Sequence, residues 1–201
     1  MAIDELLDEH EQGERVRDWL RRNGVGIVGG VLIGFALIGG WKWWQGQQQT
    51  QRMEAGAAYQ SMLEQLESGN LEQAGTQAAG LSRGAYAALA ALDIAKAQVD
   101  AGDRDAGIVT LRGIGTADPA LAGVVDQRLA RLLIDAGKPQ EALTRLAGAD
   151  DAASLEIQGD AQAALGQPDQ ARKAYTDALA RLDVAAPQRL LVEIKLTDVG
   201  G

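Results

Sequence analysis

One stretch of the sequence limits what the whole chain can fold into. The run from Gly24 to Trp41 holds eighteen residues without a single charge. As a helix that rises about 1.5 Å per residue it would span about 27 Å, and its continuation to Trp44 would reach the roughly 30 Å thickness of a bilayer's hydrocarbon core. We therefore expect three parts: a cytoplasmic tail over residues 1–23, a transmembrane helix over residues 24–44 and a folded domain over residues 45–201.

A cleaved signal peptide is the competing interpretation of this run. A signal peptide has a short basic start, an apolar stretch of about 7–15 residues and a cleavage site of small residues. Here the apolar run is longer, and the bulky segment WKWW follows it. The preceding tail is acidic, with Asp4, Glu5, Asp8, Glu9, Glu11, Glu14 and Asp18. These features predict an uncleaved anchor.

The cations on the two sides of the run predict its orientation. Four arginines precede it, whereas only Lys42 and Arg52 follow closely. The side richer in Lys and Arg remains in the cytoplasm, so the N-terminus should be cytoplasmic. In a bacterial inner membrane, residues 45–201 would then lie in the periplasm. An interfacial belt should mark the outer side, formed by Trp41, Lys42, Trp43 and Trp44.

Glycines recur along one side of the predicted span. Gly26, Gly30 and Gly34 stand four residues apart, a spacing that lets two membrane helices approach closely. Glycine is also generally frequent in membrane helices, so the pattern has a neutral interpretation as well. As a candidate function, these residues would form a helix–helix contact, either in self-association of the chain or in docking on a larger membrane protein.

The rest of the chain predicts an all-α domain. Alanine and leucine recur there at steps of three and four, as in QRLARLL at 127–133. Aromatic residues make up only 4% of the chain, and no window alternates apolar and polar residues as a half-buried strand would. Short turns such as GKP and GQP separate the helical segments.

Internal repeats predict how these helices are arranged. Four turns share a glycine that is followed, five positions later, by a small residue: Gly69 with Ala74, Gly102 with Gly107, Gly137 with Ala142 and Gly166 with Ala171. Successive glycines are 33, 35 and 29 residues apart, close to the 34-residue period of tetratricopeptide repeats. The spacing predicts stacked helical hairpins, an α-solenoid.

Further positions extend the repeat pattern around the last three glycines. A small residue stands seven positions before each glycine, where the first helix of a hairpin should meet the second: Ala95, Ala130 and Gly159. A large apolar residue stands nine positions after each glycine: Leu111, Leu146 and Tyr175. Ala178 stands twelve positions after Gly166. The first unit fits less well, since Met62 replaces the small residue, as is common for terminal repeats.

The segment after Pro187 predicts a closing helix. We expect Leu190, Ile194 and Val199 to pack against the last repeat. Stacks of this kind present concave surfaces that bind peptides or partner proteins.

Composition excludes several classes of chemistry. The chain has no cysteine and one histidine, His10, which excludes thiolate nucleophiles, cysteine zinc sites and Ser-His triads within one chain. The net charge of -9 argues against nucleic acid as a partner. Acid pairs such as Asp103 with Asp105 and Asp150 with Asp151 lack a partner that would complete a catalytic site. We expect no enzyme activity, no metal and no cofactor.

Several segments recur in an order that carries a resemblance. They are RVRDWLRRNG before the anchor, GWKWW after it, GAYAALAALDIAKAQVD at 84–100, QRLARLLIDAGKPQEALTRL at 127–146 and QGDAQAALGQPDQARKAY at 158–175. Together they resemble the YfgM family, ancillary subunits of the bacterial SecYEG translocon. The resemblance implies a single-pass inner-membrane protein with a periplasmic tetratricopeptide-like domain. It also implies association with SecYEG and with PpiD, a membrane-anchored prolyl-isomerase-like chaperone.

Two functional hypotheses remain open at this stage. The first is a non-enzymatic adaptor at the SecYEG translocon that helps transfer secreted client proteins to periplasmic chaperones. The alternative is a structural scaffold for envelope or cell-wall machinery, which would use the same anchor and repeats. An enzyme such as a membrane-bound hydrolase would require a constellation of side chains that the sequence lacks.

Overall fold

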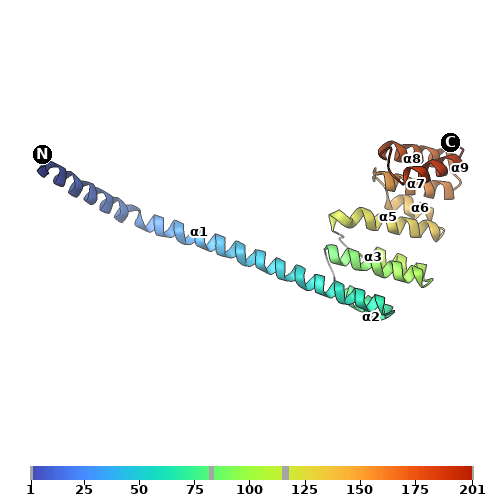
Figure 1. Cartoon of the computed structure of the whole chain (residues 1–201), viewed down its shortest axis with the longest axis horizontal. Helices are drawn as coiled ribbons and strands as arrows, with labels where there is room; N and C mark the ends of the chain where they lie inside the picture. Colours follow the sequence, from blue (N-terminus) through green and yellow to red (C-terminus); the bar gives the residue numbers. More distant parts are fainter. Residues whose placement is uncertain (1, 82–83, 115–117, 201) are drawn as a thin grey trace. The chain divides into compact units, whose positions relative to one another are not determined.

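The structure is a computed structural model that describes the backbone of residues 2–81, 84–114 and 118–200, and their side chains from residue 15 onward. These residues form nine α-helices and no β-strand (Figure 1), which confirms the predicted all-α fold. The helices are α1 (Ala2–Glu67), α2 (Leu71–Gly80), α3 (Ala85–Asp100), α4 (Arg104–Gly113), α5 (Pro119–Asp135), α6 (Pro139–Arg145), α7 (Ala152–Ala164), α8 (Pro168–Arg181) and α9 (Arg189–Asp198).

The chain divides into two compact units, Met1–Glu54 and Ala55–Gly201. Helix α1 runs through the predicted tail and span and continues to Glu67. The predicted limits of the span fall inside this one helix and stay predictions. His10 and the tail acids up to Glu14 lie outside the residues whose side chains are described.

Glycines end the first helix of each hairpin. Gly69, Gly102, Gly137 and Gly166 have φ angles of 77°, 89°, 72° and 71°, a left-handed conformation that glycine adopts without steric cost. At each of these turns the backbone N–H of the residue after the glycine donates to a carbonyl five residues earlier, at 2.8–2.9 Å. This is the pattern of a Schellman motif, and it explains why glycine recurs at the repeat period.

The second helices, and the helices that follow the loops, have clear starting signals. Pro119, Pro139 and Pro168 open α5, α6 and α8, where a proline loses no intrahelical hydrogen bond. The carboxylates of Asp103 and Asp151 accept backbone N–H bonds at the starts of α4 and α7. These acids, which belong to the pairs in the sequence, therefore cap helices.

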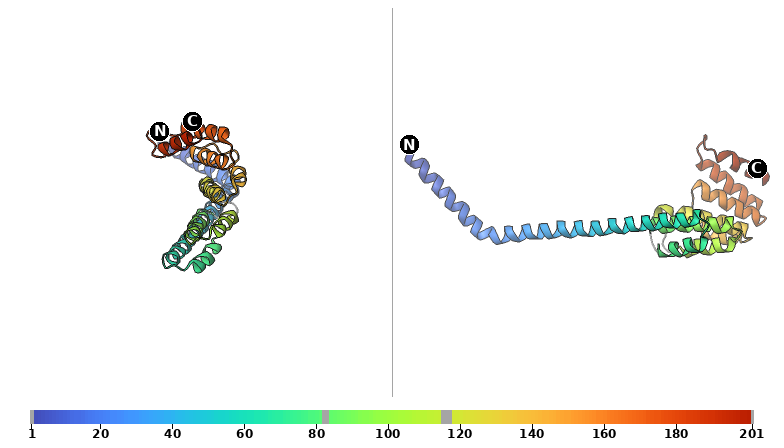
Figure 2. Two further views of the ribbon diagram at one scale, coloured as in Figure 1. Left: turned by 90° about the vertical axis from the view of Figure 1, so that its right-hand side faces the viewer. Right: turned by 60° about the horizontal axis from the view of Figure 1, so that its bottom comes forward.

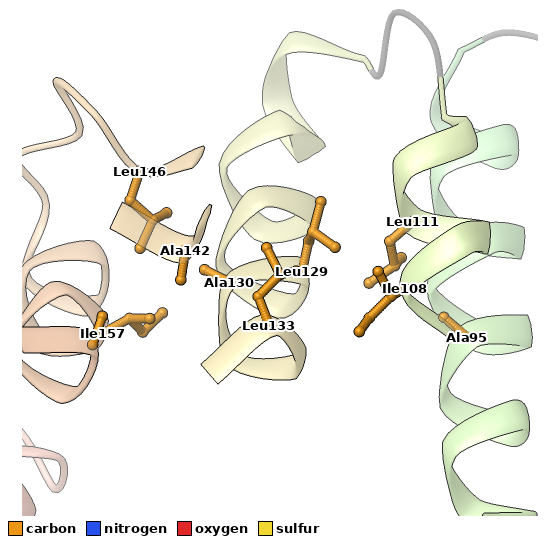
Figure 3. Close-up of a cluster of buried hydrophobic side chains, with 10 residues drawn as sticks. Ala95, Ile108, Leu111, Leu129, Ala130, Leu133, Ala142, Leu146 and Ile157 are labelled. Atoms are coloured by element: carbon orange, nitrogen blue, oxygen red, sulfur yellow. The ribbon is translucent and has the colours of Figure 1, made fainter. Parts of the chain in front are cut away.

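Three apolar clusters hold the repeat unit together. The largest joins α3 to α7, and Figure 3 shows its side chains meeting between successive helices. Its buried members are Ala95, Ile108, Leu111, Leu129, Ala130, Leu133, Ala142, Leu146, Ile157 and Ala161. A second cluster surrounds Met62 on α1, and a third surrounds Tyr175 on α8. Figure 2 shows the hairpins following one another in a curved row from green to red.

The closing helix α9 is present, but its predicted inner face is partly wrong. Val192 is buried, and Leu196 and Val199 pack beside it against the third cluster. Leu190 and Ile194 are 66% and 51% exposed. The helix is therefore rotated away from the orientation expected from its leucine and isoleucine spacing, because the buried stripe follows Val192, Leu196 and Val199 instead.

Candidate docking groove

The residues singled out in the anchor all lie on α1, within the first unit. A Cβ atom added at Gly26, Gly30 or Gly34 would meet no heavy atom within 4 Å. The rings of Trp41 and Trp44 lie 5.4 Å apart between centroids. Their function as a helix–helix contact or an interfacial belt stays a prediction.

The apolar part of α1 is the one segment of the described residues that is long and apolar enough to cross a membrane. None of its most apolar eighteen-residue window is buried inside the structure. A core helix of a soluble protein would bury such a surface, so this alternative fails here. An exposed apolar surface of this length requires a nonaqueous environment.

The repeat residues lie in the cores between the helices of the second unit. Gly159 shows why a small residue stands at its position, because the ring of Tyr175 covers its Cα. A Cβ atom at Gly159 would lie 2.4 Å from Cε1 of Tyr175. Gly107 is similarly close to its surroundings, since a Cβ there would lie 3.2 Å from the carbonyl oxygen of Ala95.

A groove lies between α3 and α5, the first helices of two successive hairpins. Its volume is about 430 Å³. The apolar part of its lining comes from Leu92, Ala95, Val99, Leu111, Val124 and Leu132, and the charged part from Asp93, Lys96, Asp100, Arg128 and Arg131. An apolar floor with a few charged groups is typical of a site that binds a peptide or small ligand.

The repeat explains why these residues face the groove. Leu92, Asp93 and Lys96 stand ten, nine and six positions before Gly102. Gln127, Arg128 and Arg131 stand at the same three positions before Gly137. The same positions of successive first helices therefore share one face, which we call the groove face.

Most charges in the groove are already engaged. Asp93 accepts a hydrogen bond from the hydroxyl of Tyr59 at 2.7 Å, and Lys96 pairs with Asp100. Arg131 lies 3.7 Å from Glu156. Among the described residues Arg128 is exposed and pairs with no acid. The groove can thus accept a chain that combines apolar side chains with a carboxylate.

The bond between Tyr59 and Asp93 leads to a titration prediction. Burial and the hydrogen bond to Asp93 raise the pKa of Tyr59 to about 12. Because the folded pKa is raised, the stability from this contact is fully present below pH 10 and is lost as the pH rises toward 12. Ultraviolet titration at 295 nm should show one phenol missing near pH 12 in Tyr59→Phe. Identical titration curves for both proteins would contradict this assignment.

A second polar cluster joins α7, α8 and α9. The Lys195 ammonium donates to Glu156 Oε1 and to Asp160 Oδ2, each at 2.7 Å. The Tyr175 hydroxyl donates to the other oxygen of Asp160 at 2.8 Å. Burial first, and then the bond to Asp160, raise the pKa of Tyr175 far above its ordinary range. Glu156 is 7% exposed, so this cluster is part of the domain's structure rather than a free site.

Sequence reasoning missed both the groove and this cluster. The repeat register placed Arg128 and Lys195 on definite helix positions, but the partners of these residues lie on other helices. Lys195 is 39 residues from Glu156, and nothing in the local pattern links the two. The one usable signal was the charged character of the positions six and nine residues before the turn glycines.

Comparisons with known proteins agree with this architecture. A family model described as a tetratricopeptide repeat-like domain matches residues 17–201. A protein of Escherichia coli named ancillary SecYEG translocon subunit is 27% identical over 200 residues, which cover 96% of this chain and 97% of that protein. A protein of the same name from Haemophilus influenzae is 29% identical over 184 residues, covering 86% and 89%. The predicted repeat fold and the resemblance expected from the order of the segments are confirmed.

Proposed function

Because this chain belongs to the tetratricopeptide repeat-like domain family, we propose that it is a non-enzymatic adaptor anchored in the bacterial inner membrane at the SecYEG translocon. The names of its relatives support the translocon as its location. The exposed apolar surface of α1 supports an anchor. The groove between α3 and α5 is the observation that carries the adaptor function, because it offers an apolar floor and an unpaired arginine to a polypeptide.

We propose that the N-terminus is cytoplasmic and that the repeat domain is periplasmic. Arg15, Arg17, Arg21 and Arg22 before the span outnumber Lys42 and Arg52 after it, which supports this orientation. In the periplasm the repeat domain would be close to secreted chains as they emerge from the translocon. A PpiD-like membrane chaperone and the secretory client proteins are its proposed partners there.

Photocross-linking from the groove tests this function. Val124 lines the groove and is 41% exposed, so p-benzoylphenylalanine at this position would contact an occupant. The control position is Val184, which is 86% exposed and lies outside the groove. With full-length protein in intact membranes, we expect a translocon subunit, a PpiD-like chaperone or a nascent secretory chain to be captured from position 124 only. Arg128→Glu should reduce that yield severalfold if the occupant carries a carboxylate.

Other outcomes of this experiment would contradict the proposal. Capture of cell-wall enzymes alone would favour the structural scaffold. Equal yields from positions 124 and 184 would show that the groove binds nothing specifically.

The glycine face leads to a separate prediction about the membrane segment. We propose that Gly26, Gly30 and Gly34 contact another membrane helix, through self-association or on the translocon. Replacing Gly30 and Gly34 by isoleucine should abolish a bacterial two-hybrid signal, because bulky side chains separate the two backbones. The matched control is Gly24→Ile with Gly46→Ile, since both glycines also have open surroundings but stand outside the stripe. An unchanged signal from the first pair would exclude the contact.

A further inference from the structure

The outer face of α9 exposes three large apolar side chains. Leu190, Leu191 and Ile194 are 66%, 50% and 51% exposed, whereas Val192 on the inner side is 1% exposed. Terminal units of solenoid repeats normally carry a polar outer face, which keeps the end of the stack soluble. The apolar face at this end of the stack therefore points to a contact.

The repeat register identifies what kind of surface this is. Gly200 has a φ of 81° and stands 34 residues after Gly166, so it occupies the place of a fifth turn glycine. Leu190, Leu191 and Ile194 then stand ten, nine and six positions before it. These are the positions of the groove face, so α9 takes the place of the first helix of a further unit.

The fold itself shows what covers these positions. Arg131 on α5, six positions before its glycine, meets Glu156 on α7, which stands ten positions before Gly166. The sixth position of one first helix therefore contacts the tenth position of the next first helix. Ile194 is the corresponding residue of α9, and the described residues supply no further helix to meet it.

The charges around the patch indicate the chemistry of the missing helix. Lys195 is engaged with Glu156 and Asp160, and Arg189 bonds the carbonyl of Leu179 and the carboxylate of Glu193. The exposed carboxylates on the outer side, Glu193 and Asp198, thus leave this border acidic. A partner with Lys or Arg at the borders of its apolar stripe would complement it.

A second copy of this chain fits this surface poorly. In a two-fold contact each residue of the patch meets the same patch of the partner. Glu193 stands next to Ile194, so two antiparallel α9 helices would bring two Glu193 side chains together. The net charge of -9 on each copy adds repulsion.

We propose that Leu190, Leu191 and Ile194 dock an amphipathic α-helix of another protein, with an apolar stripe bordered by Lys or Arg, which continues the row of first helices beyond α9. This contact lies on a different helix from the groove between α3 and α5. It stands whether or not the groove binds a client.

Photocross-linking from α9 tests the proposal on the full-length protein in intact membranes. p-Benzoylphenylalanine replaces Ile194, and the matched control replaces Val109, an apolar residue on α4 that is 67% exposed. We expect at least about fivefold more product from position 194 than from position 109. Mass spectrometry of the captured peptide should show an amphipathic helix with basic borders. Adding Leu190→Glu should remove this product while leaving the melting temperature unchanged, because Leu190 is exposed.

Several results would overturn the proposal. Equal yields at positions 194 and 109 would show that the face is not specifically covered. Capture of a second copy of this chain, of lipid alone or of an acidic segment would assign the face to a different occupant. Raising the salt concentration to 0.5 M should lower the yield severalfold by screening the charged borders, and a yield that rises with salt would contradict the charge argument.

Discussion

Replacing Gly159 by leucine should lower the melting temperature by roughly 6–12 °C. A Cβ atom at this position would lie 2.4 and 2.6 Å from two ring carbons of Tyr175. The ring cannot move aside easily, because Tyr175 is 2% exposed and its hydroxyl is bound to Asp160. Overpacking of this kind costs about 3 kcal/mol, and each kcal/mol lowers the melting temperature by about 2–4 °C in a domain of this size. Thermal unfolding followed by circular dichroism measures the change.

A matched substitution and a double variant control this experiment. Gly123→Leu places the same side chain in helix α5, where no heavy atom lies within 4 Å, so it should leave the melting temperature unchanged or raise it slightly. In a Tyr175→Leu background the Gly159→Leu change should cost less, since the ring is gone. Equal losses in both backgrounds would show that the contact with Tyr175 is not the cause.

Lys195→Met should destabilise the repeat domain by about 2 kcal/mol. The change removes the ammonium that binds Glu156 and Asp160 at 2.7 Å each. Glu156 has a side chain only 10% exposed, so its charge would lose a partner that water cannot fully replace. Leaving a buried polar group unpaired costs about 1–3 kcal/mol. The midpoint of urea unfolding should shift downward with an unchanged slope.

An exposed ion pair supplies the control for this variant. Lys173 pairs with Asp177 at 2.8 Å on the same domain, but its side chain is 78% exposed. Lys173→Met should therefore change the free energy of unfolding by less than about 0.5 kcal/mol. Adding Glu156→Gln and Asp160→Asn to Lys195→Met should recover part of the loss, because no unpaired charge remains. The explanation fails if Lys195→Met and Lys173→Met have the same midpoint.

The destabilisation should also depend on pH in a definite direction. Burial lowers the pKa of Lys195, but its bonds to Asp160 and Glu156 outweigh burial and raise it above the ordinary value. A raised pKa means that the contribution of Lys195 is fully present below about pH 10 and is lost as the pH rises through the folded value. The difference in stability between wild type and Lys195→Met should therefore be constant near neutral pH and shrink in alkaline solution.

The repeats show how far a periodic pattern can predict structure. The glycine spacing located the turns, because a left-handed residue with a Schellman hydrogen bond is a local requirement. The small residues seven positions before each glycine were similarly predictable, since a hairpin can bring two helices together only where one side chain is short. Gly159 beside Tyr175 is an example of this pairing.

The orientation of α9 shows where such reasoning failed. The sequence offers apolar residues on more than one side of this helix, since Leu190, Ile194, Val192 and Leu196 all stand at helical spacing. Helical periodicity cannot decide which of two apolar stripes turns inward. The surface of α8 decides it, by accepting Val192 and its neighbours beside Tyr175.

The groove was hidden from the sequence for a related reason. Arg128 and Asp93 are each recognisable as exposed charges on a helix, but their partners depend on how the helices stack. Tyr59 takes Asp93 across 34 residues of sequence, and Glu156 takes Arg131 across the interface of α5 and α7. Only after these pairs are assigned does Arg128 stand out as a charge with no acid beside it.

The sequence by itself determined the apolar length of the anchor, the helical hairpins and the glycine that ends each first helix, because these depend on residues close together in the chain. The tertiary structure alone decided which charges are neutralised, where the groove lies and which face of α9 remains bare. Those properties depend on helices brought together by packing, and a local pattern specifies a face without specifying the neighbour that covers it.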